Sequence, residues 1–208
     1  MADSISRRLF TTLGAGAVLG AGARQTLADD KPTSPAPPKP VEAAFERDYP
    51  EPKFKPSWKK PQINRVLVAD FVIYAHSELD LARKLIDKEP GLLNAAMDWG
   101  NGDWETALGG ASHMGRRDIV EFLLDRGARI DIFCAAMMGQ LEAVKAFLTL
   151  QPKLIDAKGP HGFSLHFHAQ VGGKESENVL DYLQSVKPIE LKPNPFLKKP
   201  GDASKSGK

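Results

Sequence analysis

The chain has 208 residues and a formal net charge of only +2, from 28 Lys and Arg against 26 Asp and Glu. Three of the arginines lie in the first 28 residues, and without that segment the chain is formally neutral. This balance excludes the global basic field that holds nucleic acid. The single cysteine excludes a disulfide within the chain.

The first 28 residues predict an export signal. Arg7 and Arg8, in the run SRRLF, precede a weakly apolar Gly/Ala-rich stretch that ends in small residues. The pattern resembles a twin-arginine signal peptide, with cleavage after Ala28 or, as a second choice, after Ala23. That resemblance implies a periplasmic or extracellular protein with no stable membrane insertion after cleavage. A mitochondrial transit peptide and an unstructured basic terminus are the alternatives.

Residues 29–62 predict an extended linker. Nine of the 16 prolines of the chain lie between positions 31 and 61, and such a segment cannot continue a helix or a sheet. Aromatic residues are frequent here, so we expect the part from Phe54 to Pro61 to fold back on the first helical unit. The alternative is a plain tether. At the other end, residues 185–208 are rich in Lys and Pro and predict a disordered tail.

Residues 63–184 contain a helix whose apolar spacing recurs. Apolar residues at i, i+1, i+4 and i+5 fall on one stripe of a helix, and a neighbouring copy can bury that stripe. The third unit is too short for a full hairpin, so we expect Asp131 to cap its first helix directly. The four copies of the stripe are Leu81, Ala82, Leu85 and Ile86; Ile119, Val120, Leu123 and Leu124; Ala143, Val144, Phe147 and Leu148; and, more weakly, Val179, Tyr182 and Leu183.

Residues 102–131 resemble a single ankyrin repeat. The matching positions are Gly102, Thr106, Leu108 and Ala111 in the opening turn and first helix, Gly115 at its end, Asp118 to Leu124 in the second helix, and Gly127 and Ala128 in the closing turn. Ala107 and Gly109 depart from the pattern, because the family has proline and histidine there. The resemblance implies an all-α ankyrin-repeat solenoid of about four helix pairs with short β-hairpin fingers, and a protein that binds protein partners.

The connection between the first two units predicts a projecting hairpin. It carries Trp99 and Trp104 in the Gly-rich sequence DWGNGDWE, and tryptophan is enriched at binding hot spots. We expect Trp99 to be exposed and Trp104 to be partly structural. The expected partner-binding residues are Asp98, Trp99, Asn101, Asp103, Trp104, Glu105 and His113, with His161 and Phe163 on the last finger.

The same finger suggests an alternative function. The carboxylates of Asp98, Asp103 and Glu105 beside two tryptophans could form an acid pair of an envelope hydrolase, or a carbohydrate-binding platform. The chain has no Gly-x-Ser-x-Gly elbow, phosphate loop or Cys-x-x-Cys motif. We therefore expect a monomeric binding module with no catalytic residues.

Three histidines, His161, His166 and His168, lie close together in the sequence. Side chains at i and i+2 on a helix point about 200° apart, so His166 and His168 cannot chelate one ion from a helix. The sequence therefore predicts neither a metal nor another cofactor. Cys134 lies in a run of small residues, and we expect it to be buried.

Overall fold

The computed structural model describes residues 42–57 and 59–194. The chain divides into two units, Met1–Lys55 and Pro56–Lys208. In the first unit, residues 42–55 form neither helix nor strand, and the side chain of Phe54 is exposed. The predicted signal peptide, the start of the linker and the end of the tail lie outside the described residues. The expected fold-back of Phe54 to Pro61 stays a prediction.

The described part of the second unit is mainly helical, in agreement with the predicted all-α class. Its eight α-helices are α1 (Arg65–Tyr74), α2 (Leu79–Lys88), α3 (Ala107–His113), α4 (Arg117–Asp125), α5 (Ile132–Met137), α6 (Leu141–Leu150), α7 (Leu165–Val171) and α8 (Glu177–Val186). Its only strands, β1 (Ala96–Asp98) and β2 (Trp104–Thr106), form the antiparallel hairpin expected between the first two units. The short 3-10 helices are η1 (Pro90–Asn94), η2 (Pro152–Asp156), η3 (Pro160–Gly162) and η4 (Gly173–Ser176).

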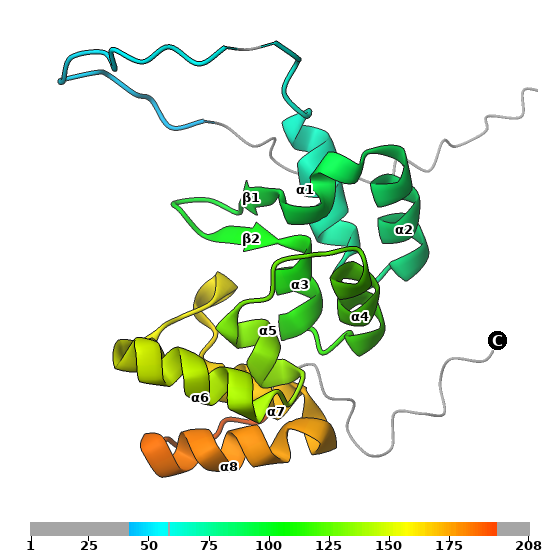
Figure 1. The fold of residues 1–208 in the computed structure, drawn as a ribbon, viewed down its shortest axis with the longest axis vertical. Coiled ribbons are helices and arrows are strands. Elements are labelled where there is room, and N and C mark those ends of the chain that lie inside the picture. Colours follow the sequence, from blue (N-terminus) through cyan, green and yellow to red (C-terminus); the bar gives the residue numbers. More distant parts are fainter. Residues whose placement is uncertain (1–41, 58, 195–208) are drawn as a thin grey trace, which may run out of the picture. The chain divides into compact units, whose positions relative to one another are not determined.

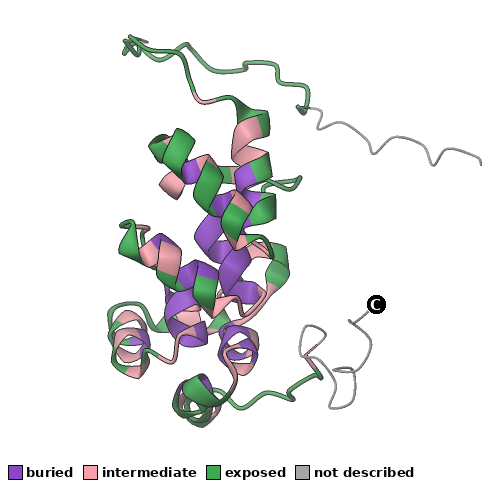
Figure 2. Ribbon diagram, turned by 90° about the vertical axis from the view of Figure 1, so that its right-hand side faces the viewer, coloured by how far each residue is buried: buried purple, intermediate pink, exposed green. Residues whose placement is uncertain are grey.

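The helices pack as four consecutive pairs. Each odd-numbered helix contacts the helix that follows it and also the next odd-numbered helix, so that α1, α3, α5 and α7 form a central column (Figure 1). Buried residues concentrate in this column, whereas the outer helices are exposed on one side (Figure 2). The pairs thus bury one another's apolar faces.

Three helices of the column begin with the same kind of cap. The side chains of Thr106, Asp131 and Ser164 accept hydrogen bonds from the backbone N–H groups three residues later, at 3.1, 2.8 and 3.2 Å. Such a cap satisfies a donor that the first turn of a helix leaves unpaired. The prediction that Asp131 caps its helix directly is confirmed.

The apolar stripes are buried with one shift of position. Val120 of α4 and Val144 of α6 are fully buried, as the repeated pattern predicts. In α4, Leu123 is completely buried and Leu124 only partly, whereas in α6 Leu148 is buried and Phe147 only partly, so the deeper of the last two stripe positions differs between the two helices. A helix of 3.6 residues per turn lets either neighbour face the core, and packing against the adjacent pair decides which does.

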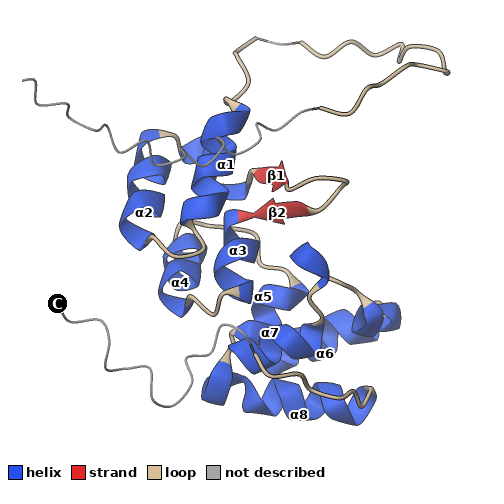
Figure 3. Cartoon of the chain, turned by 180° about the vertical axis from the view of Figure 1, so that it is seen from behind, coloured by secondary structure: helices blue, strands red, loops and turns tan. Residues whose placement is uncertain are grey.

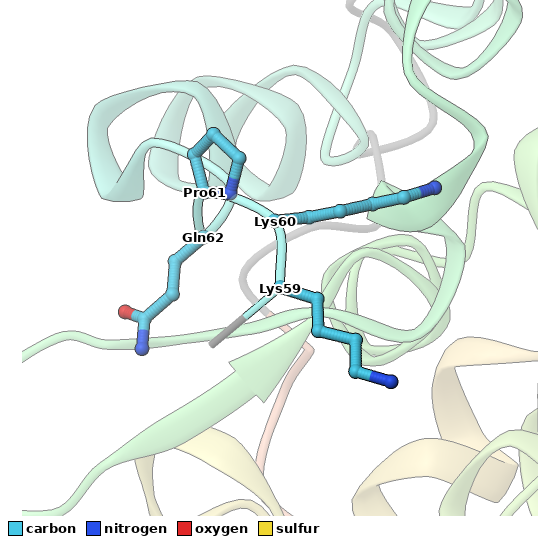
Figure 4. A pocket seen from close by; sticks show the side chains of 4 residues that line it. All are labelled: Lys59, Lys60, Pro61 and Gln62. Atoms are coloured by element: carbon cyan, nitrogen blue, oxygen red, sulfur yellow. The ribbon is translucent and has the colours of Figure 1, made fainter. Parts of the chain in front are cut away.

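Three smaller features complete the description. Cys134 is buried, as expected. Residues 59–62, which lead into α1, line an open depression, and their side chains point in different directions rather than toward a common point (Figure 4). None of the described helices has the length and apolar character needed to cross a bilayer.

Candidate functional site

The tip of the hairpin is held by a carboxylate. Asp98 Oδ1 accepts hydrogen bonds from the backbone N–H groups of Gly100 and Gly102, at 2.8 and 3.1 Å. Gly100, Asn101 and Gly102 all have positive φ, which glycine adopts without steric cost and asparagine more easily than most residues. Asp98 is therefore a turn-forming residue, although it is exposed as expected.

Strand β2 turns Glu105 inward and Trp104 outward. Successive side chains of a strand point to opposite faces, and Glu105 is only 1% exposed whereas Trp104 is 63% exposed. A buried carboxylate needs partners that offset the loss of water. The partners of Glu105 are Trp99, whose Nε1 donates to Oε2 at 2.7 Å, and three histidines.

Three imidazole rings converge on the Glu105 carboxylate. His113 Nδ1 lies 3.0 Å from Oε1, while His76 Nε2 and His161 Nε2 lie 3.3 and 3.6 Å from Oε2. One potential ligand atom from each of the four residues falls within 4.8 Å of all the others. We call His76, Glu105, His113 and His161 the histidine–glutamate cluster.

The cluster joins segments that are far apart in the chain. His76 follows the C-terminus of α1, Glu105 lies in β2, His113 is the last residue of α3, and His161 lies in the η3 turn before α7. The hairpin lies beside α1 and α3, which brings the first three together (Figure 3). Asp103 holds the fourth, because its carboxylate accepts from the His161 backbone N–H at 2.9 Å and contacts Nδ1 at 2.8 Å.

Glu105 and the histidines beside it shift one another's pKa values. Burial alone would raise the pKa of Glu105, but hydrogen bonds and charge from His113 and His76 lower it to about 2. Burial likewise would lower the pKa of His76, yet the hydrogen bond to Glu105 and its charge raise it. Glu105 is thus an anion throughout the physiological range.

Aromatic rings enclose the cluster. Trp99 packs edge-on against His76 and His161, with ring centroids 5.8 and 5.3 Å apart. On the other side, the centroid of His113 lies 5.4 Å from that of Phe163, which stacks on Phe167 at 4.1 Å. These rings reduce the access of water to the Glu105 carboxylate.

The structure corrects two expectations for the partner surface. Glu105 and His113 are buried, so they cannot contact a partner directly, because strand alternation turns Glu105 inward and the His113 ring faces its carboxylate, with Nδ1 3.0 Å from Oε1. Trp99 is exposed, as expected, but Trp104, which was expected to be partly structural, is the more exposed of the two, at 63% against 42%. Trp99 is also bonded to Glu105. The expected residues with a solvent-accessible position are Asp98, Trp99, Asn101, Asp103, Trp104, His161 and Phe163.

The remaining two histidines stay outside the cluster. His166 Nε2 lies 2.9 Å from the carbonyl oxygen of Lys187, and His168 Nδ1 lies 2.9 Å from that of Ser164. Burial lowers the pKa of His168 to about 4, so this ring is neutral at pH 7. The sequence reasoning missed His76, which lies in no local pattern with the other three. Its one signal is that it follows α1 in nearly the place that His113 has at the end of α3.

A shallow groove of about 320 Å³ runs beside the hairpin. Its lining comes from three consecutive units, at the hairpin, the openings of α3 and α5, and the segment 158–160 that leads into η3. The residues that line it are Gly102, Asp103, Trp104, Thr106, Gly109, Asp131, Phe133, Lys158, Gly159 and Pro160. Comparisons with models of protein families and with curated protein sequences each found no match for this chain.

Proposed function

We propose that this chain is an exported ankyrin-type binding module that takes a segment of a protein partner and has no catalytic activity of its own. The observation that carries the proposal is the shallow groove. Stacked repeats present equivalent loops side by side, and these loops form extended binding surfaces. The four packed helix pairs, with a capped helix opening in each of the last three, support the ankyrin-type solenoid.

Trp104 is the anchor we propose for the partner. Its side chain is 63% exposed beside the groove, and a large exposed aromatic ring at the edge of a concave surface is typical of a binding hot spot. Phe133 adds a second apolar ring, while Asp103 and Lys158 offer one charge of each sign. An extended peptide with an apolar side chain and a polar backbone fits this lining.

The arrangement gives little support to the hydrolytic alternative. A hydrolytic acid pair needs one carboxyl with a raised pKa to donate a proton. Here Glu105 has a pKa of about 2 and Asp98 accepts two backbone hydrogen bonds in its own turn. The groove is shallow, whereas a catalytic pocket encloses its substrate.

A site-specific crosslinking experiment tests the binding proposal. A photoreactive amino acid at position 104 is expected to crosslink a protein of the cell envelope, and the same amino acid at position 150 is not. Leu150 is the matched control because it is 85% exposed but lies outside the groove. Equal crosslinking from both positions, or none from position 104, would contradict the proposed surface.

Export by the twin-arginine route is the second part of the proposal and rests on Arg7 and Arg8. We expect Arg7→Lys combined with Arg8→Lys to leave the uncleaved chain inside the cell, because the paired arginines define this signal. Cell fractionation with N-terminal sequencing measures the outcome. Normal processing of the double variant would rule out the twin-arginine route.

A further inference from the structure

We propose that the histidine–glutamate cluster binds a divalent transition-metal ion of the zinc type. The ligands are His76 Nε2, His113 Nδ1, His161 Nε2 and a carboxylate oxygen of Glu105. None of these four residues lines the groove, so variants of the ligands test metal binding apart from partner binding, whereas Asp103, which holds His161, belongs to the groove as well.

The distances in the cluster have the scale of a metal site. Zinc bonds to nitrogen and oxygen of about 2.0 to 2.2 Å in a tetrahedron place neighbouring ligand atoms about 3.4 Å apart. The three contacts to the Glu105 carboxylate measure 3.0, 3.3 and 3.6 Å. All ligand atoms lie within 4.8 Å of one another, so the rings need to close by only about 1 Å around an ion.

The hydrogen bonds of two rings set the tautomer that a metal requires. His76 Nδ1 lies 2.8 Å from the Val72 carbonyl oxygen, which can only accept, so Nδ1 carries the hydrogen. His161 Nδ1 likewise lies 2.8 Å from the Asp103 carboxylate, which accepts its hydrogen. In each neutral ring the Nε2 lone pair is then directed to the cluster. A carbonyl or carboxylate behind the ring is the usual support of a metal-binding histidine.

A cation satisfies this arrangement better than the neutral rings do alone. The Nε2 atoms of His76 and His161 both face Glu105 Oε2, and all three are acceptors when the rings are neutral. Oε2 already accepts a hydrogen bond from Trp99 Nε1. These acceptors repel one another. A hydrogen on Nε2 of each ring would also relieve that repulsion, but both N–H groups would have to donate to the same oxygen, Oε2. One divalent ion accepts the lone pairs of all three atoms at once.

The surrounding backbone is shaped to fit the rings. A Cβ atom at position 110 would lie 2.6 Å from Cε1 of His76, so Gly110 leaves the room that this imidazole occupies. His161 adopts a φ of 57°, a left-handed conformation that costs energy for a residue with a side chain. Asp103 holds it there through the backbone N–H and the ring.

The ligand set indicates both the metal and its role. Three imidazole nitrogens and one carboxylate suit Zn²⁺, Co²⁺, Ni²⁺ or Cu²⁺ and not Mg²⁺ or Ca²⁺, which prefer oxygen ligands. Four protein ligands fill a tetrahedral site, as in structural zinc centres. The ion would fasten the end of α1, the hairpin, the end of α3 and the η3 turn to one another. The sequence predicted no metal, because the local pattern joins His161 only with His166 and His168.

A cobalt titration of the tag-free, chelator-treated full chain tests the site directly. We expect one Co²⁺ per chain, the intense visible absorption of tetrahedral cobalt, and loss of that absorption when Zn²⁺ is added. Zn²⁺ at about 100 times its Kd should raise the Tm by about 5 to 10 °C, and Mg²⁺ should not. A wild-type chain with no tetrahedral cobalt spectrum would overturn the proposal, whatever the variants do.

Matched variants assign the ligands. We expect His76→Gln and His161→Gln each to weaken Co²⁺ binding by about 100-fold or more. Asp103→Asn, which alters a positioning residue, should weaken it by about 10 to 100-fold. His166→Gln changes a histidine outside the cluster and should bind as wild type does. Circular dichroism verifies that each variant is folded. Unchanged binding by folded His76→Gln, or an equal loss in folded His166→Gln, would overturn the assignment.

Discussion

The histidine–glutamate cluster and the apolar stripe of α4 hold adjacent helix pairs together in opposite ways. The stripe buries Ile119, Val120 and Leu123 completely, and these residues lie within one helix. The cluster buries one carboxylate, Glu105, among side chains from four separate segments. Apolar burial is tolerant of direction, whereas a buried charge requires each partner in place. A change in the cluster should therefore affect several elements, and a change in the stripe should remain local.

The largest effect is expected from removing the central charge. Glu105→Ala should lower the free energy of unfolding of the metal-free chain by about 3 to 5 kcal/mol, because it removes the buried carboxylate that His76, His113 and the Trp99 Nε1–H all face. Urea unfolding in the presence of a chelator measures it. Glu142→Ala, which breaks an exposed pair with Lys145, is the control and should cost no more than about 1 kcal/mol. Equal losses of stability in the two variants would show that the buried carboxylate contributes no more than an exposed ion pair.

A pair of leucines tests the apolar side of the comparison. Leu123→Ala should cost about 2 to 5 kcal/mol, since the side chain is fully buried and leaves a cavity. Leu124→Ala should cost less, because that side chain is only partly buried. Urea midpoints of the two variants give the order. The reverse order would mean that Leu124, rather than Leu123, is the deeper position of the stripe.

His168, which is buried and lies outside the cluster, makes the stability of the chain depend on pH. The folded pKa of His168 is about 4, below its ordinary value of 6.5, because burial disfavours the charged ring. Above pH 6.5 the ring is neutral in both the folded and the unfolded chain, so its burial costs no stability. Stability is lost as the pH falls from 6.5 toward 4, by up to about 3 kcal/mol.

His168→Gln removes this titration and keeps a side-chain donor for the Ser164 carbonyl oxygen. The stability of wild type minus that of the variant should fall between pH 7 and pH 4, as urea unfolding at several pH values would measure. A difference that stays constant over this range would show that His168 does not titrate in this way.

The smallest effects distinguish the two tryptophans of the hairpin. Trp99→Ala should cost about 2 kcal/mol of stability, because it removes a hydrogen bond to a buried charge. Trp104→Ala should stay within about 1 kcal/mol of wild type, since its side chain is mainly exposed. Thermal unfolding compares them directly. A larger loss for Trp104 would restore the order that the sequence predicted.

Some local features escaped the sequence reasoning although their signal was present. The 3-10 helices η1 and η2 both begin with a proline after α2 and α6, in the related sequences EPGLLN and QPKLID. Proline has a φ suited to the first position of a helical turn. Reading these two segments against each other would have shown a second repeated motif beside the apolar stripes.

By itself the sequence determined the features that depend on neighbours along the chain. Periodic apolar residues predicted the helices, Asp131 predicted a cap, and DWGNGDWE predicted a hairpin, because each uses contacts within a few residues. Tertiary structure alone decided which of Leu123 and Leu124 lies deepest and which tryptophan is enclosed. It also brought His76 and His161 to one carboxylate. Those outcomes depend on contacts between distant segments, and the spacing of residues along a chain does not specify such contacts.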